Sequence, residues 1–179
     1  MQRHTPVRLT LHHTAVPLDD ARDSPARLRQ HQDFHMDDPD HDYPDIAYHF
    51  MVDRRGNIFE GRDLRYRGDT ATGYDPTGHF LVCCEGDYDR QQPTVAQAES
   101  VAALFAWASR EYGIDPRTAA GHNAYADTSC PGESWVRRIR SESLRRSVQA
   151  ATAQDRDLRY LSASDSRRAV ALIESGSIG

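Results

Sequence analysis

Histidine and cysteine side chains from separate parts of this sequence could together hold a metal ion. His122 and Cys130 lie eight residues apart in a segment, residues 121–132, that we expect to be a loop between a strand and a helix. A neutral imidazole and a thiolate are ligands that zinc prefers, and a loop of this length can bring both onto one ion. A third ligand from His12 would give a His₂Cys set with one open position, which is typical of a catalytic zinc site.

His12 and His13 are adjacent at the end of the first strand-like run. Neighbouring residues in a strand point to opposite faces of the sheet, so only one of the two can enter a given site. His12 shares its face with Thr10 and Thr14, whereas His13 shares its face with leucines. A face with two hydroxyl groups suits an open cleft better, so the alternation favours His12. The alternative is a core histidine that hydrogen-bonds to the backbone.

A second pair of histidines, His31 and His35, lies four residues apart on a predicted helix. Two imidazoles at this spacing can share a metal ion, but the segment lacks the glutamate of the zinc-binding helix in metalloproteases. We therefore assign no metal to this pair. His49 and His79 fall in or beside predicted strands, and we expect both to be structural.

The composition excludes several kinds of chemistry and partner. All 22 basic residues are arginine, which rules out a Schiff-base lysine, a lysine general base and a P-loop lysine. The formal net charge of -5, with charges dispersed along the chain, disfavours nucleic acid as a partner. Cys83 and Cys84 are adjacent and the cysteine count is odd, so we expect no disulfide framework.

The chain of 179 residues predicts one domain. No run is apolar over the roughly 18 residues of a membrane span, and the first residues lack the apolar stretch of a signal peptide. We therefore expect no membrane insertion and a protein that is cytoplasmic as synthesised. We also expect a monomer. Action on a cell wall would then require release or export by another route.

Short strand-like runs alternate with longer amphipathic runs, which predicts an α/β fold. Strands are expected over residues 7–14, 46–53, 58–60, 80–84 and 118–121, and helices over 25–36, 94–112 and 133–148. Thr94 and Gly113 are suited to begin and end the second helix. Residues 1–149 would form the domain, residues 150–179 a C-terminal tail or added helix, and residues 61–78 a long loop with a possible functional role.

Four sequence blocks, in this order and at these separations, are similar to a known family: LTLHHTAVP, DIAYHFMVDRRGNIFEGR, GHFLVCCEGDYDRQQPT and AAGHNAYADTSCPG. Together they resemble the type-2 N-acetylmuramoyl-L-alanine amidases, a group that includes phage endolysin amidases and peptidoglycan recognition proteins. The resemblance covers roughly residues 8–140. It implies a single domain with a central mixed β-sheet flanked by helices, and zinc as the cofactor.

The resemblance also implies roles for particular residues. The family's zinc ligands correspond to His12, His122 and Cys130, which are the residues that ligand chemistry and strand alternation favour. The family's catalytic tyrosine, in a Tyr-His-Phe context, corresponds to Tyr48, and a threonine beside the metal corresponds to Thr128. His35 resembles a histidine that lines the substrate groove in many recognition proteins.

The chain departs from the family pattern at positions that concern the substrate's peptide. Where recognition proteins often have Gly-Arg-Gly-Trp, a determinant of preference for diaminopimelate, this chain has Gly61-Arg62-Asp63-Leu64. A groove histidine in the next block is replaced by Thr70, and the usual Gly-His-Arg is Gly121-His122-Asn123. The preference for one type of stem peptide therefore cannot be transferred.

The resemblance implies hydrolysis of the amide bond between N-acetylmuramic acid and L-alanine, in peptidoglycan or in soluble muropeptides. A non-catalytic peptidoglycan-binding recognition module is the main alternative, and retention of the cysteine ligand Cys130 argues against it. Among amidases, a cytosolic enzyme that recycles muropeptides and a phage-type lytic enzyme both fit. A structural zinc protein would need a closed site with four ligands, and the sequence does not force a fourth histidine or cysteine into the site.

Overall fold

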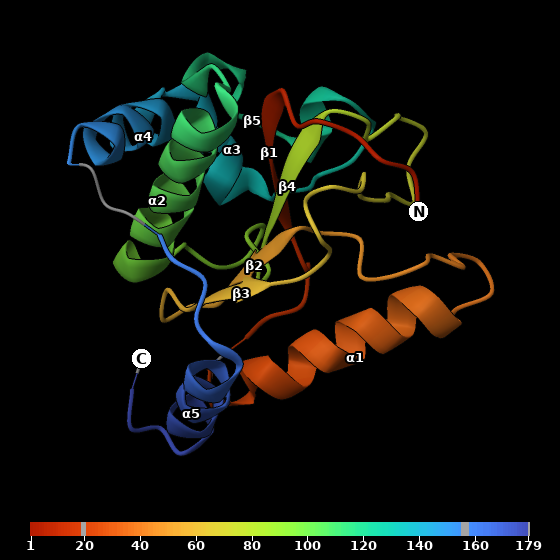
Figure 1. Ribbon diagram of the computed structural model, residues 1–179. Helices are drawn as coiled ribbons and strands as arrows, with labels where there is room; N and C mark the ends of the chain where they lie inside the picture. Colours follow the sequence, from red (N-terminus) through yellow and green to blue (C-terminus); the bar gives the residue numbers. More distant parts are fainter. Residues whose placement is uncertain (19–20, 155–157, 179) are drawn as a thin grey trace.

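A five-stranded mixed β-sheet forms the centre of the protein (Figure 1). The structure, a computed structural model, describes residues 1–18, 21–154 and 158–178. The strands lie in the order β3-β2-β4-β1-β5, with bounds Arg8–His13 (β1), Phe50–Val52 (β2), Ile58–Glu60 (β3), His79–Cys84 (β4) and Ala120–Gly121 (β5). All pairings are parallel except that of β3 with β2.

Helices cover both faces of the sheet (Figure 1), so the predicted α/β fold with a flanked mixed sheet is confirmed. The described α-helices are α1 (Ser24–Asp37), α2 (Val95–Tyr112), α3 (Glu133–Arg140), α4 (Ser143–Ala153) and α5 (Ala163–Glu174). The described 3₁₀ helices are η1 (Ala21–Asp23), η2 (Pro116–Thr118) and η3 (His122–Ala124). Within the described ranges, no helix combines the length and apolar character that a membrane crossing requires.

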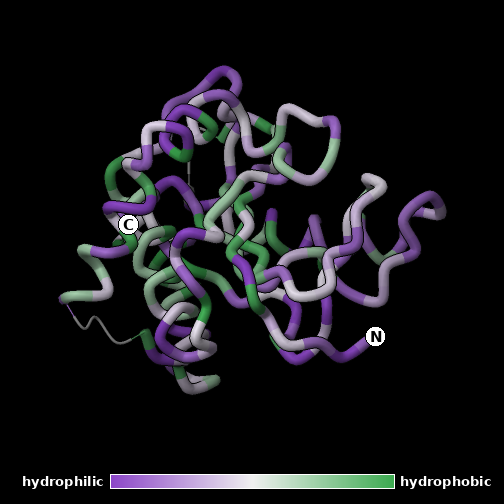
Figure 2. Tube along the Cα trace, turned by 90° about the horizontal axis from the view of Figure 1, so that it is seen from above, coloured by the Kyte–Doolittle hydropathy of each residue, from purple (hydrophilic) through white to green (hydrophobic). Residues whose placement is uncertain are grey.

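The main hydrophobic core lies between the sheet and α2. Leu9 and Leu11 of β1 are fully buried in a cluster that includes Phe105 of α2. A smaller cluster around Met51 lies on the other face, where α1 packs. In Figure 2 the hydrophobic segments meet in the middle of the molecule, and the loops near the N-terminus are mostly hydrophilic. The alternation along β1 therefore sends its leucines into the main core and leaves His12 on the opposite face.

The predicted ends of the second helix are confirmed in α2. The side chain of Thr94 accepts a hydrogen bond from the backbone N–H of Gln97 at 3.1 Å, which satisfies a donor that the first helical turn leaves free. Gly113 follows the helix with φ 66°, a left-handed conformation that glycine adopts without steric penalty. These two residues explain why α2 begins and ends where it does.

The prediction of a single helix over residues 133–148 is wrong, because the helix is interrupted by a break between α3 and α4. Glu142 adopts a left-handed conformation with φ 60° at this break. The hydroxyl groups of Ser141 and Ser143 donate to the carbonyl oxygen of Arg138 at 3.3 and 3.1 Å. In a continuous helix that oxygen would accept from the N–H of Glu142, so the serines compete with the helical bond.

The strand predicted over residues 46–53 is shorter than expected, since only Phe50–Val52 form β2. The buried guanidinium of Arg62 explains part of the difference. It donates to the carbonyl oxygens of Asp45 and Ile46 at 2.6 and 2.8 Å, so a side chain takes the place of a neighbouring strand there. The strand predicted over 118–121 is likewise reduced to Ala120–Gly121, because η2 occupies the residues before it.

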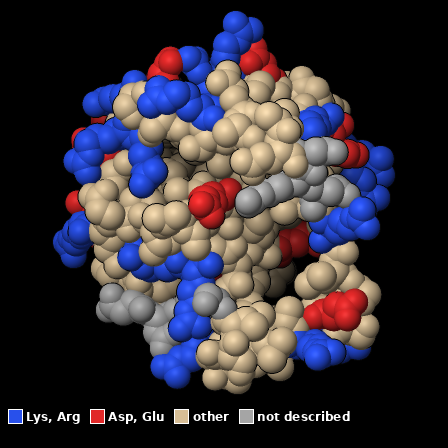
Figure 3. Space-filling model, turned by 90° about the vertical axis from the view of Figure 1, so that its left-hand side faces the viewer, with Lys and Arg blue, Asp and Glu red and all other residues tan. Residues whose placement is uncertain are grey.

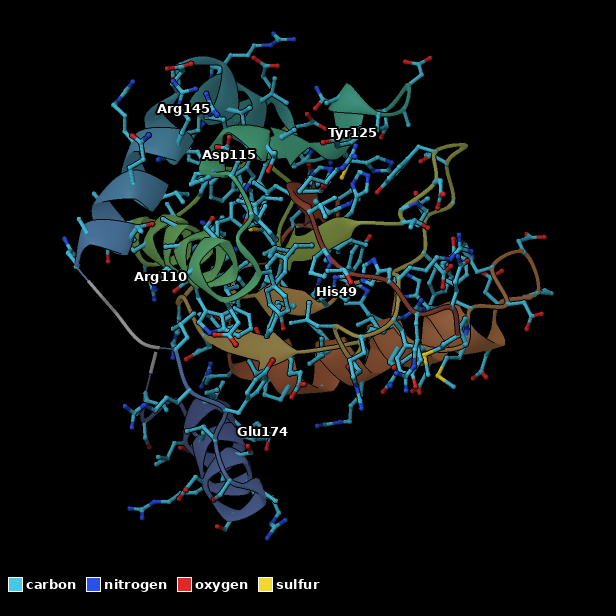
Figure 4. The ribbon with its side chains drawn as sticks, turned by 45° about the horizontal axis from the view of Figure 1, so that its top comes forward. His49, Arg110, Asp115, Tyr125, Arg145 and Glu174 are labelled. Atoms are coloured by element: carbon cyan, nitrogen blue, oxygen red, sulfur yellow. The ribbon has the colours of Figure 1, made fainter. Side chains whose placement is uncertain are left out.

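The C-terminal helix α5 lies beside the N-terminal end of α1 (Figure 1). Ile173 of α5 is 4% exposed. Glu174, labelled in Figure 4, lies on the same helix, and its carboxylate is 3.4 Å from the guanidinium of Arg29 in α1. The predicted domain boundary at residue 149 falls inside α4, and the division of the chain at that point stays a prediction.

Candidate metal centre

Three side chains from distant parts of the sequence lie together at the edge of the sheet where the parallel strands end. β1 and β5 are parallel neighbours paired at Leu11 and Gly121, so the residues that follow, His12 and His122, lie side by side. Their ring centroids are 4.6 Å apart. Cys130 joins them, and one possible ligand atom from each of the three residues lies within 4.8 Å of the others.

The spacing of these atoms fits a tetrahedral zinc ion. Zinc–sulfur and zinc–nitrogen distances of about 2.3 and 2.1 Å separate sulfur and nitrogen by about 3.6 Å at a tetrahedral angle. Nδ1 of His12 lies 3.7 Å from Sγ of Cys130. Within the described part of the chain, no further histidine, cysteine or carboxylate belongs to the group. Three protein donors are the number found in catalytic zinc sites.

Burial favours the neutral form of both imidazoles. It lowers the pKa of His12 well below its ordinary value, and repulsion by His122 adds to this effect. Burial also lowers the pKa of His122. Burial raises the pKa of the Cys130 thiol to about 12, so the thiolate form needs a positive charge beside it. A divalent cation would supply that charge, and a neutral imidazole has a lone pair to offer it.

Tyr48 lies beside these ligands in a cavity of about 140 Å³. Its ring centroid is 5.1 Å from that of His12, and the buried thiol of Cys83 lies close to its hydroxyl. Burial raises the pKa of Tyr48 well above its ordinary value, and the neighbouring Cys83 and Cys130 add to this shift. The hydroxyl therefore stays protonated at neutral pH and can donate a hydrogen bond.

His35 lines the same cavity from α1, and Thr70 lines it from the loop between β3 and β4. The ring centroid of His35 lies 5.8 Å from that of Tyr48. Burial, and then the neighbouring His31 and His41, lower the pKa of His35 to about 4, so this imidazole is neutral at neutral pH. Beside the candidate ligands the cavity therefore presents neutral hydrogen-bonding groups together with the acidic side chain of Asp69. Contact of His35 with a substrate stays a prediction.

Thr128 is not among the residues that line this cavity. Its hydroxyl oxygen accepts a hydrogen bond from the backbone N–H of Cys130 at 3.2 Å. The contact fixes the turn immediately before the cysteine. A role of Thr128 toward a substrate stays a prediction.

Three of the remaining histidines, His13, His49 and His79, have structural contacts. Nδ1 of His13 accepts a hydrogen bond from the backbone N–H of Tyr88 at 3.2 Å, on the side of the sheet away from the three ligands. Nδ1 of His49 accepts from the N–H of Leu81 at 3.0 Å, and His79 is hydrogen-bonded to the hydroxyl of Thr10. The structure thus brings His12, and not His13, to the candidate site.

Two loop residues that contact the candidate ligands are not predicted from the sequence. Thr72 Oγ1 lies 2.6 Å from Nε2 of His122, and the Tyr74 hydroxyl lies 3.5 Å from Nε2 of His12. Both residues come from the loop between β3 and β4. No motif or periodic pattern marks them, and the length of the polar segment 61–78 is the only signal in the sequence.

A larger hollow of about 340 Å³ lies away from this site, between α2 and α4. Small side chains, including Ala98, Ala102 and Ala151, form much of its lining, which contains no histidine or cysteine. The charges visible in Figure 3 are also interspersed, with arginines and acidic groups on the same face. The chemistry of the side chains around His12 therefore identifies the candidate site better than cavity size does.

Comparison with known proteins agrees with this geometry. A family model described as N-acetylmuramoyl-L-alanine amidase matches residues 2–133. The chain belongs to the N-acetylmuramoyl-L-alanine amidase family. All three candidate ligands lie within the part that matches the family.

Relatives within the N-acetylmuramoyl-L-alanine amidase family carry two kinds of name. A human N-acetylmuramoyl-L-alanine amidase is 32% identical over 138 residues, which cover 74% of this chain and 23% of the human protein. Peptidoglycan-recognition protein SC2 of Drosophila simulans is 30% identical over 118 residues, or 65% of this chain and 62% of that protein. The chain thus spans about a quarter of the human amidase and most of the insect protein.

A solved structure of the same fold is that of human PGRP-IBETAC in complex with glycosamyl muramyl pentapeptide. It has a TM-score of 0.66 and 25% sequence identity, and the match covers 74% of this chain and 82% of that chain. The fold of the amidase family is therefore shared with a protein whose ligand is a muramyl peptide.

Proposed function

We propose that this protein hydrolyses the amide bond between N-acetylmuramic acid and L-alanine in peptidoglycan or soluble muropeptides, and that the reaction depends on zinc. Family membership supports the substrate class. The observation that carries the proposal is the convergence of His12, His122 and Cys130, whose ligand atoms lie within 4.8 Å of one another beside a cavity. A His₂Cys set is typical of a catalytic zinc site.

His12, His122 and Cys130 would hold the zinc ion. When bound, zinc supplies Lewis-acid chemistry, lowering the pKa of water toward about 7 and polarising the amide carbonyl. Because the Cys130 thiolate carries a negative charge, the ligand set leaves less positive charge than three histidines would. Hydrogen-bond donors from the protein therefore become more important for the hydrolysis of an unreactive amide.

Tyr48 and Thr128 are the donors that we assign. The Tyr48 hydroxyl stays protonated because burial raises its pKa, so it can orient the attacking water or donate to the developing oxyanion. The Thr128 oxygen accepts from the N–H of Cys130, which leaves its own hydrogen free to donate to the tetrahedral intermediate. One such donor contributes on the order of 3 kcal/mol to the transition state. His35 would contact the substrate as a neutral imidazole.

A recognition module without catalytic activity is the second candidate, because several relatives are named peptidoglycan recognition proteins. Such a module needs a groove for muramyl peptides but no metal. The burial of a cysteine beside two neutral histidines is unnecessary for binding alone, and it favours hydrolysis.

Digestion of purified peptidoglycan with mass analysis of the products tests the proposal. We expect zinc-loaded native protein to release free stem peptides and Cys130→Ala to release none. Cys84→Ala, at a buried cysteine on the opposite side of β4, is the matched control and should stay active. Intact sacculi and soluble muropeptides, assayed in parallel, distinguish a lytic enzyme from a recycling enzyme. Binding of muropeptides without release of stem peptides would contradict the proposal and support a recognition module.

A further inference from the structure

The loop between β3 and β4 places a hydroxyl group against each of the two candidate histidine ligands. The contacts are 2.6 Å from Thr72 Oγ1 to His122 Nε2 and 3.5 Å from the Tyr74 hydroxyl to His12 Nε2. We propose that Thr72 and Tyr74 are positioning residues, which orient these imidazoles so that Nδ1 of each faces the metal. This inference rests on the proposed function, because it concerns the same zinc site.

The distances assign the two nitrogens of each ring. Nδ1 of His12 is the atom that lies 3.7 Å from the sulfur of Cys130, so Nε2 is on the side away from that ligand. In His122, Nε2 is engaged by Thr72, which leaves Nδ1 for the ion. A neutral imidazole that offers the lone pair of Nδ1 carries its hydrogen on Nε2. Each Nε2–H group then donates to a hydroxyl oxygen of the loop.

Thr70 supports Thr72 in this arrangement. The two Oγ1 atoms are 2.8 Å apart, and the backbone N–H of Thr72 donates to Oγ1 of Thr70 at 3.2 Å. The Thr72 hydroxyl can therefore accept from Nε2 of His122 and donate to Thr70 at the same time. Thr70 also lines the cavity, so one short segment contributes to both the ligand contacts and the groove wall.

Tyr74 is held in place by aromatic neighbours. Its ring stacks on Tyr125 with centroids 5.5 Å apart, and it lies 5.1 Å from His79 and 5.2 Å from His122. Tyr125 comes from the segment just after η3, and Figure 4 shows it at the top of the molecule. Packing fixes the Tyr74 ring, and the hydroxyl adds the contact to His12. Substitution by phenylalanine separates these two contributions.

Outer partners of metal-bound histidines typically change metal affinity by about 10- to 100-fold when they are removed. We therefore expect Thr72→Val, which keeps the shape of the side chain, to weaken zinc binding by about this factor. Thr72→Ser retains the hydroxyl and should restore affinity close to the native value. Tyr74→Phe should weaken binding by less than about 10-fold, because its contact of 3.5 Å is longer.

The experiment measures the zinc dissociation constant by competition with a chelating dye, together with the thermal unfolding of each zinc-free variant. Thr5→Val, at an exposed threonine, and Tyr112→Phe, at the end of α2, are matched controls and should bind zinc like the native protein. A second measurement, ¹⁵N correlation of the histidine side chains in the zinc-loaded protein, should find the hydrogen on Nε2 of both His12 and His122.

Native affinity in Thr72→Val, or a hydrogen on Nδ1 of His122 in the zinc-loaded protein, would overturn the inference. If the native protein binds zinc and releases stem peptides while Thr72→Val binds zinc equally well, only the inference fails. If the native protein binds no zinc, the proposed function fails and the inference fails with it.

Discussion

At the scale of single residues, burial determines which groups around His12 can donate and which can accept. It keeps His12 and His35 neutral and Tyr48 protonated, because each charged form loses its hydration. Cys130 differs, since its useful form is the charged thiolate, which burial disfavours. The same low-dielectric environment therefore keeps the imidazoles in the neutral form that can bind a cation, whereas the thiolate needs a cation beside it to form.

Tyr48→Phe tests the role of the tyrosine hydroxyl. The ring would still pack against His12, so zinc content and stability should change little. Loss of one donor to the transition state should lower kcat by about 100-fold or more. Turnover of a soluble muropeptide and zinc per chain are the measurements. An unchanged kcat at full zinc content would rule out the proposed role.

Glu85 lies outside the candidate site and has a buried carboxyl group with few polar contacts. Its side chain is 2% exposed, and Nε of Arg27 lies 3.6 Å from one carboxylate oxygen. Neither carboxylate oxygen has a hydrogen-bond partner. Burial raises the pKa of Glu85 from 4.5 to about 7, so the native state retains a proton that the unfolded chain loses between these pH values.

The free energy of unfolding should therefore fall as the pH rises from 4.5 to 7. Glu85→Gln removes this titration, so the variant should gain stability relative to the native protein across that window, by on the order of 3 kcal/mol. Urea unfolding at pH 5 and pH 8 measures the effect, with Glu99→Gln, an exposed glutamate of α2, as the matched control. An equal difference between variant and native protein at both pH values would contradict the assignment.

At the scale of helices and strands, local signals predict some boundaries and miss others. Thr94 and Gly113 mark the ends of α2 because capping and left-handed turns depend on nearby residues alone. The break between α3 and α4 depends on hydroxyls of Ser141 and Ser143 competing for one carbonyl oxygen, which hydrophobic periodicity does not register. The short length of β2 is explained in part by contacts of Arg62, which lies ten positions after the end of the strand. The length of β2 therefore depends on the tertiary fold.

The attachment of α5 gives a prediction at this scale. Ile173 is buried although most of the helix surface is exposed, so it should anchor α5 to the body of the protein. Ile173→Ala should lower the free energy of unfolding by about 2 kcal/mol or more. Glu174→Gln removes only the exposed ion pair with Arg29 and should change stability by less than about 1 kcal/mol. Equal stability of both variants in urea unfolding would show that α5 contributes little to the fold.

At the scale of the whole molecule, the sheet topology brings the candidate ligands together. Ligand chemistry and strand alternation favour His12, His122 and Cys130 in the sequence, and the structure brings these three side chains together because β1 and β5 end at one edge of the sheet. Their role as metal ligands stays a prediction. Thr72 and Tyr74 could not be predicted in this way. Their places depend on the path of a long loop without regular structure, which the sequence pattern does not determine.

The family contains proteins named amidases and proteins named peptidoglycan recognition proteins, so the shared fold does not decide between cleavage and binding. Whether this chain cleaves its substrate or only binds it depends on the local donor set and on whether that donor set binds a metal. Cys83 must be considered as another sulfur ligand, because it pairs in register with His12 and is a second thiol close to the site.

Zinc K-edge X-ray absorption of the zinc-loaded protein tests the metal site most directly. We predict one zinc per chain, with two nitrogen ligands, one sulfur ligand at about 2.3 Å and a further oxygen ligand from solvent. Two sulfur ligands, which would bring Cys83 onto the ion, or a complete set of four protein ligands, would contradict an open catalytic centre formed by His12, His122 and Cys130.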